Sequence, residues 1–298
     1  MSERDMSARI HDRGYRRYDG DRTGVTGAMS STFRHTVARI LGLRRTARAK
    51  VLPFIVIGIS YFPAIVFVGI GVFLPKRLAR TSFPGYANYY GFIVSAILLF
   101  AAFVAPEALC PDRRSRLLGV YLTSPLDRRT YLLSKLAAVV ACISGVTLVP
   151  VLIMALAKSL QGTGPSPGDL VVLLGRILIS GAMLALFYSI VSLATSSLTD
   201  RKGFASAGNV LAAIVTGAVA TALRRTLSDG ADLFSGRGDW TVVIDLANLP
   251  LEIVHRVYGE RGTFAGASTL TLVAGLLVWT ALGLALMMWR YQKLEVTR

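Results

Sequence analysis

Six long apolar stretches dominate the sequence and limit the folds that are open to it. Each runs for about 20 residues or more, the length that a helix needs to cross roughly 30 Å of hydrocarbon at about 1.5 Å per residue. Lipid cannot pair a free backbone amide, and stretches this long and continuous are too long for barrel strands, so all six are expected to be helices. The predicted spans cover residues 51–74, 88–109, 132–157, 170–195, 203–223 and 268–289.

The composition agrees with a membrane protein. Of the 298 residues, 53% are hydrophobic and 17% are charged, against about 45–50% and about 25% in soluble domains. The sequence therefore predicts an all-α polytopic membrane protein. A polar stretch precedes the first apolar run, so we expect no cleavable signal peptide and expect the first span to act as the targeting signal.

Basic residues are distributed unevenly between alternate loops. Segments on one side of the predicted bundle hold 23 of the 33 Lys and Arg residues, and segments on the other hold 9. The positive-inside rule then predicts a multi-pass protein of the bacterial inner or cytoplasmic membrane with both termini in the cytoplasm. The net charge of +16 is attributed to this topology, and not to nucleic-acid binding. The first set of segments is 1–50, 110–135, 200–202 and 290–298, and the second is 75–87, 158–169 and 224–267.

The region before the first span divides into two parts. Residues 1–30 are rich in Arg, Asp, Gly and Ser and are expected to form a disordered cytoplasmic tail. Residues 31–50 show apolar and basic positions at helical spacing, which predicts a basic amphipathic helix in the membrane interface. The simpler alternative is a charged flank of the first span. The apolar positions are Phe33, Val37, Ile40 and Leu41, and the basic ones are Arg34, Arg39, Arg44, Arg45 and Arg48.

The loop after the second span is the most informative segment. Pro111 and Asp112 suit the first turn of a helix, and the apolar residues after them fall on one face, so a short helix is predicted over 111–123. An apolar face beside arginines suits a groove on a partner protein. The alternative is that the face packs on the protein's own cytoplasmic end or on the bilayer. The apolar residues are Leu117, Leu118, Tyr121 and Leu122.

Ser124, Pro125 and Asp127 predict the start of the next helix. Ser124 suits the N-cap, Pro125 the first helical position and Asp127 the capping-box position. The second and third spans are therefore expected to be joined by a compact helix–turn–helix.

The fifth span and the region after it have distinct compositions. The span is rich in Ala and Gly, which allow close packing against a helix of this chain or of a second copy. Residues 225–267 form the largest predicted external segment, with one or two helices expected on or partly inside the outer leaflet. The residues that share one helical face there are Ile253, Val254, Val257 and Tyr258, after an earlier Trp240.

Motifs for catalysis or metal binding are not found. The sequence lacks G-x-x-x-x-G-K-S/T, so an ATP-driven role requires a second polypeptide. His11, His35 and His255 lie in three separate segments without an H-E-x-x-H motif or a cysteine cluster, so no catalytic, cofactor or metal site is expected. Glu107 is expected to pair with Arg113 or to cap the loop helix, and no buried carboxylate relay is evident.

The order of these elements resembles the permease subunit of the ABC type-2 exporters. That family has an interfacial helix, two spans, a cytoplasmic coupling loop, three spans, an external helical loop and a sixth span. Gly119 is followed by Val120 where the family more often has Gly-Thr, which indicates a divergent branch. The residues that carry the resemblance are Pro106-Glu107, Asp112-Arg113, Leu118-Gly119-Val120-Tyr121-Leu122, Ser124-Pro125-Leu126, Tyr131 and Lys135, with the polar turn Ser197-Leu198-Thr199-Asp200-Arg201.

The resemblance implies two permease subunits, identical or related, that work with two separate ATPase subunits. ATP and Mg are then expected on the ATPase, and no cofactor on this chain. The segment 111–123 is implied to dock on the ATPase as a coupling helix, and the first and fifth spans to line the dimer seam and substrate path. The coupling residues implied are Glu107, Asp112, Arg113, Arg116, Leu117, Leu118, Tyr121, Leu122, Ser124 and Pro125, and those of the seam or path are Asn209, Ala213 and Gly217.

The sequence indicates the cargo and the partners only as broad classes. Apolar spans with few external charges favour an amphipathic or lipid-like cargo over a polyanion, and membrane lipids are expected partners. The leading hypothesis is the membrane subunit of an ATP-driven exporter, which is not an enzyme by itself. The alternatives are an ion-coupled carrier or channel, and a membrane-embedded enzyme or lipid-processing protein.

Overall fold

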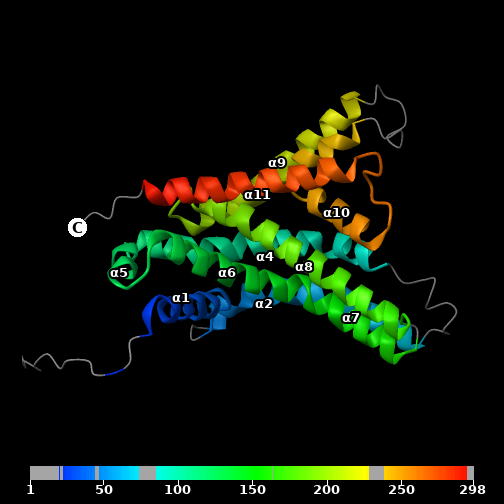
Figure 1. The fold of residues 1–298 in the computed structure, drawn as a ribbon, viewed down its shortest axis with the longest axis horizontal. Helices are drawn as coiled ribbons and strands as arrows, with labels where there is room; N and C mark the ends of the chain where they lie inside the picture. The colour runs from blue at the N-terminus through cyan, green and yellow to red at the C-terminus, as the bar shows by residue number, and fades with distance from the viewer. Residues whose placement is uncertain are drawn as a thin grey trace, which may run out of the picture.

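The computed structural model describes an elongated bundle of helices, most of which run along its long axis (Figure 1). Across the part of the chain that it describes, every regular element is a helix. The expected disordered tail lies mostly outside the described part, as do Arg44 and Arg45. The structure describes residues 20, 23–43, 47–73, 85–162, 164–227 and 238–293.

Six spans within the described residues are long and apolar enough to cross a membrane, one in each stretch where the sequence predicts a span. The prediction of an all-α polytopic membrane protein is thereby confirmed. Five of the spans are single helices and the third consists of two. The helices are α2 (Ala47–Phe73), α4 (Tyr86–Arg114), α6 (Arg128–Thr147) with α7 (Val149–Leu160), α8 (Pro167–Ser196), α9 (Lys202–Leu227) and α11 (Thr269–Gln292).

The third span is interrupted at Leu148, where α6 ends and α7 begins. Pro150 follows in the first turn of α7, where its missing N–H is tolerated because the first amides of a helix have no partner within that helix. Gly181 of α8 faces this junction, and a Cβ added to it would lie 2.1 Å from Leu148 Cδ2. Thr147 Oγ1 donates to the Gly181 carbonyl at 3.0 Å. Close approach of α8 therefore fixes the junction.

Helix α4 lies at the centre of the bundle and is the most buried of the six spans. It packs against α2, α6, α8 and α9. Its fully buried side chains include Tyr89, Tyr90, Ile97 and Phe100. Helix α4 therefore contacts most of the other spans.

Helix α1 (Gly24–Ile40) packs across α6 and α4. It begins inside the stretch expected to be disordered, so that boundary was wrong. Its buried residues are Ile40, which belongs to the predicted apolar stripe, and Thr32 and Thr36, which each stand one position before a residue of that stripe. The two threonines tolerate burial because Thr32 Oγ1 donates to the Ala28 carbonyl and Thr36 Oγ1 to the Thr32 carbonyl. Their small size allows a close approach to α6.

The loop helix predicted over 111–123 is shorter than expected. Helix α4 continues through Pro111 to Arg114, and only α5 (Leu118–Thr123) follows a turn in which Arg116 has φ 52°. The predicted helix start at Pro111 is wrong, because ion pairs to the buried Asp112 hold the last turn of α4 in place.

The start predicted for α6 is also wrong, by three residues. Asp127 is its N-cap residue, with an extended backbone, and the helix begins at Arg128. Ser124 belongs to the end of α5 instead, because its hydroxyl donates to the Tyr121 carbonyl at 2.5 Å. Ser and Thr hydroxyls often donate backward to a preceding carbonyl, which competes with N-capping.

Opposite α5, the bundle is closed by a short 3-10 helix η1 (Asp239–Ile244) and by α10 (Asn248–Tyr258). The expected apolar face of α10 exists, but it packs on α4, α8 and α11, with Val254 fully buried. The face therefore covers the bundle, and the position of α10 relative to the outer leaflet stays a prediction. We call the end that carries α1, α5 and the end of α11 the α5 end, and the opposite one the α10 end (Figure 1).

Three carboxylates are buried at the α10 end, a feature that the sequence did not reveal. Asp239 pairs with Arg224 at 2.7 Å and accepts from the Gly266 amide. Glu252 accepts from the Phe264 amide at 3.2 Å, and Asp245 accepts from the amides of two residues that follow it. Each carboxylate thus holds a neighbouring turn or loop in place.

Candidate functional site at the α5 end

Asp112, near the end of α4, is the centre of a buried ionic cluster. Its side chain is 0% exposed, and Arg39 Nη1 of α1 lies 2.5 Å from Oδ1. Lys135 Nζ of α6 lies 2.6 Å from Oδ2, and the Tyr131 hydroxyl donates to the same oxygen at 2.8 Å. We call Arg39, Asp112, Tyr131 and Lys135 the Asp112 cluster. It joins three helices through one carboxylate.

The charges of the Asp112 cluster do not cancel. Two cations surround one carboxylate, and Lys135 is as deeply buried as Asp112. Taking each ion out of water costs several kcal/mol, and only close pairing offsets that penalty. Burial alone would lower the pKa of the Arg39 guanidinium, but its hydrogen bond and attraction to Asp112 outweigh burial and raise that pKa. The cluster therefore retains one net positive charge.

Helix α5 is attached to the same cluster through Tyr121. The ring of Tyr121 lies 5.2 Å from that of Tyr131, and Lys135 Nζ lies within 5.6 Å of both ring centres. Burial and the nearby Asp112 carboxylate raise the pKa of the Tyr121 phenol. Because the cation lies near two aromatic rings, cation–π attraction adds to the packing.

The apolar face predicted for partner binding packs mostly inward. Leu118 is 9% exposed, and Tyr121 and Leu122 pack on the core. Of the two alternatives that the sequence left open for these residues, packing on the protein's own end is the one found. The opposite side of the loop is open to a partner. Its exposed residues are Ser115, Arg116, Val120, Thr123 and Pro125.

The other residues implied in coupling attach α4 to the turn between α8 and α9. Glu107 pairs with Lys202, and Arg113 Nη1 donates to the carbonyls of Ser197 and Thr199. The predicted pair between Glu107 and Arg113 is thus replaced by two contacts with this turn. Both contacts hold the end of α4 against the polar turn.

The end of α11 is joined to the same region. Arg128 Nη1, in the first turn of α6, donates to the Tyr291 carbonyl at 3.3 Å and to the Gln292 carbonyl at 2.6 Å. Cations interact favourably with carbonyls at a helix C-terminus, because those groups have no partner within the helix. The rings of Tyr131 and Tyr291 are 6.1 Å apart. The α5 end is therefore one connected assembly.

Three members of the Asp112 cluster, Arg39, Tyr131 and Lys135, were not predicted as site residues. The sequence predicts Arg39 as a basic position of an amphipathic helix. Tyr131 and Lys135 appear only among the residues that carry the family resemblance. Arg39 stands 73 positions before Asp112, and the spacing in the sequence does not indicate their pairing. The sequence signal was limited to the joint occurrence of Asp112, Tyr131 and Lys135.

Two of the three α9 positions implied in the seam, Asn209 and Gly217, lie against other parts of the chain. Asn209 Nδ2 donates to Ser196 Oγ at 3.3 Å, and a Cβ on Gly217 would lie 3.6 Å from the Asp245 carboxylate. Ala213, between them, is half-buried. The seam or substrate path predicted at Asn209, Ala213 and Gly217 stays a prediction. The opposite face of α9 is apolar and exposed. Its residues are Val210, Leu211, Ile214, Val215 and Val219.

These features define a polytopic helical membrane protein whose spans are held together at one end by a buried ionic cluster and a short exposed loop helix. A family model described as ABC-2 family transporter protein matches residues 72–285, and the chain belongs to this family. It is thus a permease component of an ABC transporter, a transport subunit. No curated protein matches the chain. Helix α1, with Arg39, lies outside the matched residues.

Proposed function

We propose that this permease exports an amphipathic or lipid-like molecule from the cytoplasm, driven by a separate ATPase subunit that docks at the α5 end. Permeases of this family generally work with an ATPase subunit. In this proposal two permease subunits and two ATPase subunits form the transporter, and ATP and Mg bind to the ATPase. The loop helix then faces the cytoplasm, in agreement with the excess of basic residues at this end.

One observation carries the proposal. The short helix α5 exposes Val120 at 66% while its inner face is fixed to the Asp112 cluster. A partner seated on the exposed side therefore pushes on α1, α4 and α6 together, since Asp112 joins all three. ATP shifts such an equilibrium only by binding one arrangement of the subunits more tightly than another. The rigid connection supplies a route for that difference to reach the spans.

The docking surface is tested with a charge at its apolar centre. We expect Val120→Asp to leave the fold intact, because the residue is exposed, and to reduce co-purification with the cognate ATPase by about tenfold or more. Full burial of such a side chain contributes about 1.5–3 kcal/mol, and burying an unpaired carboxylate adds a larger penalty. ATP hydrolysis by the complex and cargo transport should fall in parallel.

Arg129→Asp serves as the matched control, since Arg129 is exposed at the same end but lies in α6. It should leave the complex nearly unchanged, because a solvated charge contributes less than about 1 kcal/mol. The permease alone, which lacks a phosphate-binding loop, should hydrolyse no ATP. Normal complex formation by Val120→Asp would show that the ATPase docks elsewhere.

A further inference from the structure

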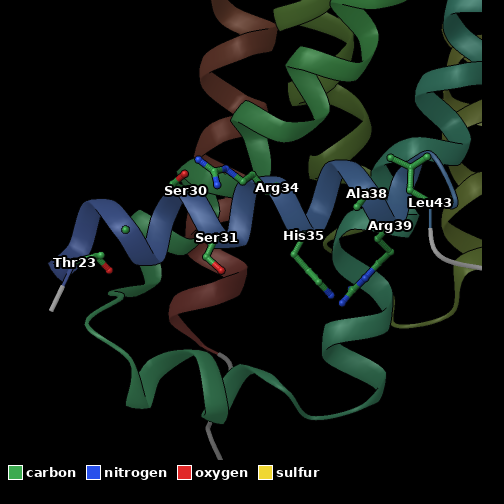
Figure 2. Close-up of a pocket in the computed structure, with 9 residues that line it drawn as sticks. Thr23, Ser30, Ser31, Arg34, His35, Ala38, Arg39 and Leu43 are labelled. Carbon is green, nitrogen blue, oxygen red and sulfur yellow. The ribbon is translucent and has the colours of Figure 1, made fainter. Parts of the chain in front are cut away.

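An open groove runs along the outward side of α1. Its volume is about 960 Å³, and its described lining consists of Thr23, the N-cap residue of α1, and of residues of α1 and the turn after it. Figure 2 shows Ser31, His35 and Arg39 along one edge of α1 and Ser30 and Arg34 along the other. The described lining has several hydroxyl groups and two guanidinium groups, and contains no carboxylate. Its chemistry suits an anion.

Arg34 is the residue best placed to hold that anion. It stands on the side of α1 opposite the buried Thr32 and Thr36 and is exposed. It forms no ion pair with any residue of the described part of the chain. Arginine presents a planar fork of donors that matches phosphate oxygens in pairs. A phosphate in the groove is therefore within reach of Arg34, a strong donor that has no ion-pair partner in the described part of the chain.

The Asp112 cluster makes the groove more positive. Arg39 lines the groove and also pairs with Asp112, which already has a second cation in Lys135. One carboxylate cannot neutralise both cations, so a net positive charge remains beside the groove. The guanidinium of Arg39 has five N–H donors, and further donors remain after its bond to Asp112.

The start of α2, the helix that follows α1, is expected at the depth of the lipid headgroup layer. Helix α2 begins at Ala47 soon after α1, and its apolar span begins at Pro53. Six residues of helix correspond to about 9 Å, whereas the headgroup region on each side of the hydrocarbon is about 5–7 Å thick. Helix α1 also crosses the spanning helices that lie behind it (Figure 2). The start of α2 is therefore expected in the headgroup layer, and α1 precedes it closely in the sequence.

We propose that this groove binds the phosphate group of an acidic phospholipid in the leaflet at the α5 end, with Arg34 as the main contact. Acidic lipids are attracted to basic segments beside a membrane by about 1 kcal/mol per residue. The inference concerns the permease alone and does not depend on ATPase docking.

The test uses the purified full chain in a neutral detergent and measures its unfolding temperature against added phosphatidylglycerol. We expect a saturable rise, with the midpoint lipid concentration about fivefold higher for Arg34→Ala, the fold-change that corresponds to about 1 kcal/mol. Arg129→Ala removes the same charge at the same end, outside the groove, and should leave the midpoint unchanged. Equal unfolding temperatures without lipid would verify that both variants fold.

Three results would overturn the proposal. Equal shifts in the midpoint for Arg34→Ala and Arg129→Ala would indicate general surface attraction and no site. An equal rise with phosphatidylcholine would remove the requirement for an acidic headgroup. A full rise with inorganic phosphate alone, and no further effect of phosphatidylglycerol, would identify a soluble phosphate compound as the ligand instead of a lipid.

Discussion

At the scale of single residues, Asp112 decides how the α5 end is built. A carboxylate that is 0% exposed persists as an ion only because Arg39, Lys135 and the Tyr131 hydroxyl surround it. Attraction in such an interior is strong, but so is the loss of hydration, and the balance depends on close geometry. The main effect of the cluster is therefore to fix one arrangement of three helices. Loss of any member should weaken that arrangement.

Replacement of the Asp112 carboxylate should strongly destabilise the permease. We expect Asp112→Asn to destabilise the permease by about 3–5 kcal/mol, because it leaves two buried cations without a counter-ion. The measurement is chemical or thermal unfolding of the purified chain. Asp112→Asn combined with Lys135→Met should lose less than the sum of the two single variants, since the pair contributes as a unit.

Asp127→Asn provides the comparison. Asp127 is exposed and its side chain makes no capping hydrogen bond, although it is the N-cap residue of α6. Its replacement should change stability by less than about 0.5 kcal/mol. If Asp112→Asn were no worse than Asp127→Asn, the buried ionic cluster would contribute nothing to holding the helices.

At the scale of elements, the six spans were predictable and the short connections were not. A span is specified by its length and apolar composition, which lipid imposes along the whole segment. The start of α6 depends instead on whether Ser124 bonds forward or backward, and the hydroxyl suits both. Likewise, the periodicity of α5 identified an apolar face at Leu118 and Tyr121, but helical spacing does not reveal what covers a face.

The inward packing of α5 leads to a second prediction about stability. Leu118→Ala should destabilise the permease by about 2–5 kcal/mol, the range for truncating a buried leucine, because its side chain is only 9% exposed. Val120→Ala, two residues later on the exposed side, should change stability by less than about 0.5 kcal/mol. Thermal unfolding of both purified variants measures the difference. Equal stability would place Leu118 on a free surface and return it to the set of residues available to a partner.

At the scale of the whole molecule, the two ends of the bundle have different constructions. Charged contacts at the α5 end join neighbouring helices and the end of α11, whereas carboxylates at the α10 end hold turns and loops over the bundle. The contacts at the α5 end thus connect spans to one another, whereas those at the α10 end hold loops that cover the bundle. If force enters through an ATPase, the connected α5 end is the one suited to receive it.

The direction of export then rests on which end faces the cytoplasm. The charge bias of 23 against 9 Lys and Arg residues favours the α5 end. Thr123 is exposed at that end, and Trp240, in η1 at the other end, is 50% exposed. In a variant with Cys110→Ala and Cys142→Ala, we expect Trp240→Cys to react with an impermeant maleimide in intact cells. Thr123→Cys should react only after the membrane is permeabilised, which also verifies that its thiol is accessible. The reverse pattern would place α5 outside the cell, where no ATP-driven subunit meets it, and the proposed mechanism of export would be wrong even though the family and the six spans would stand.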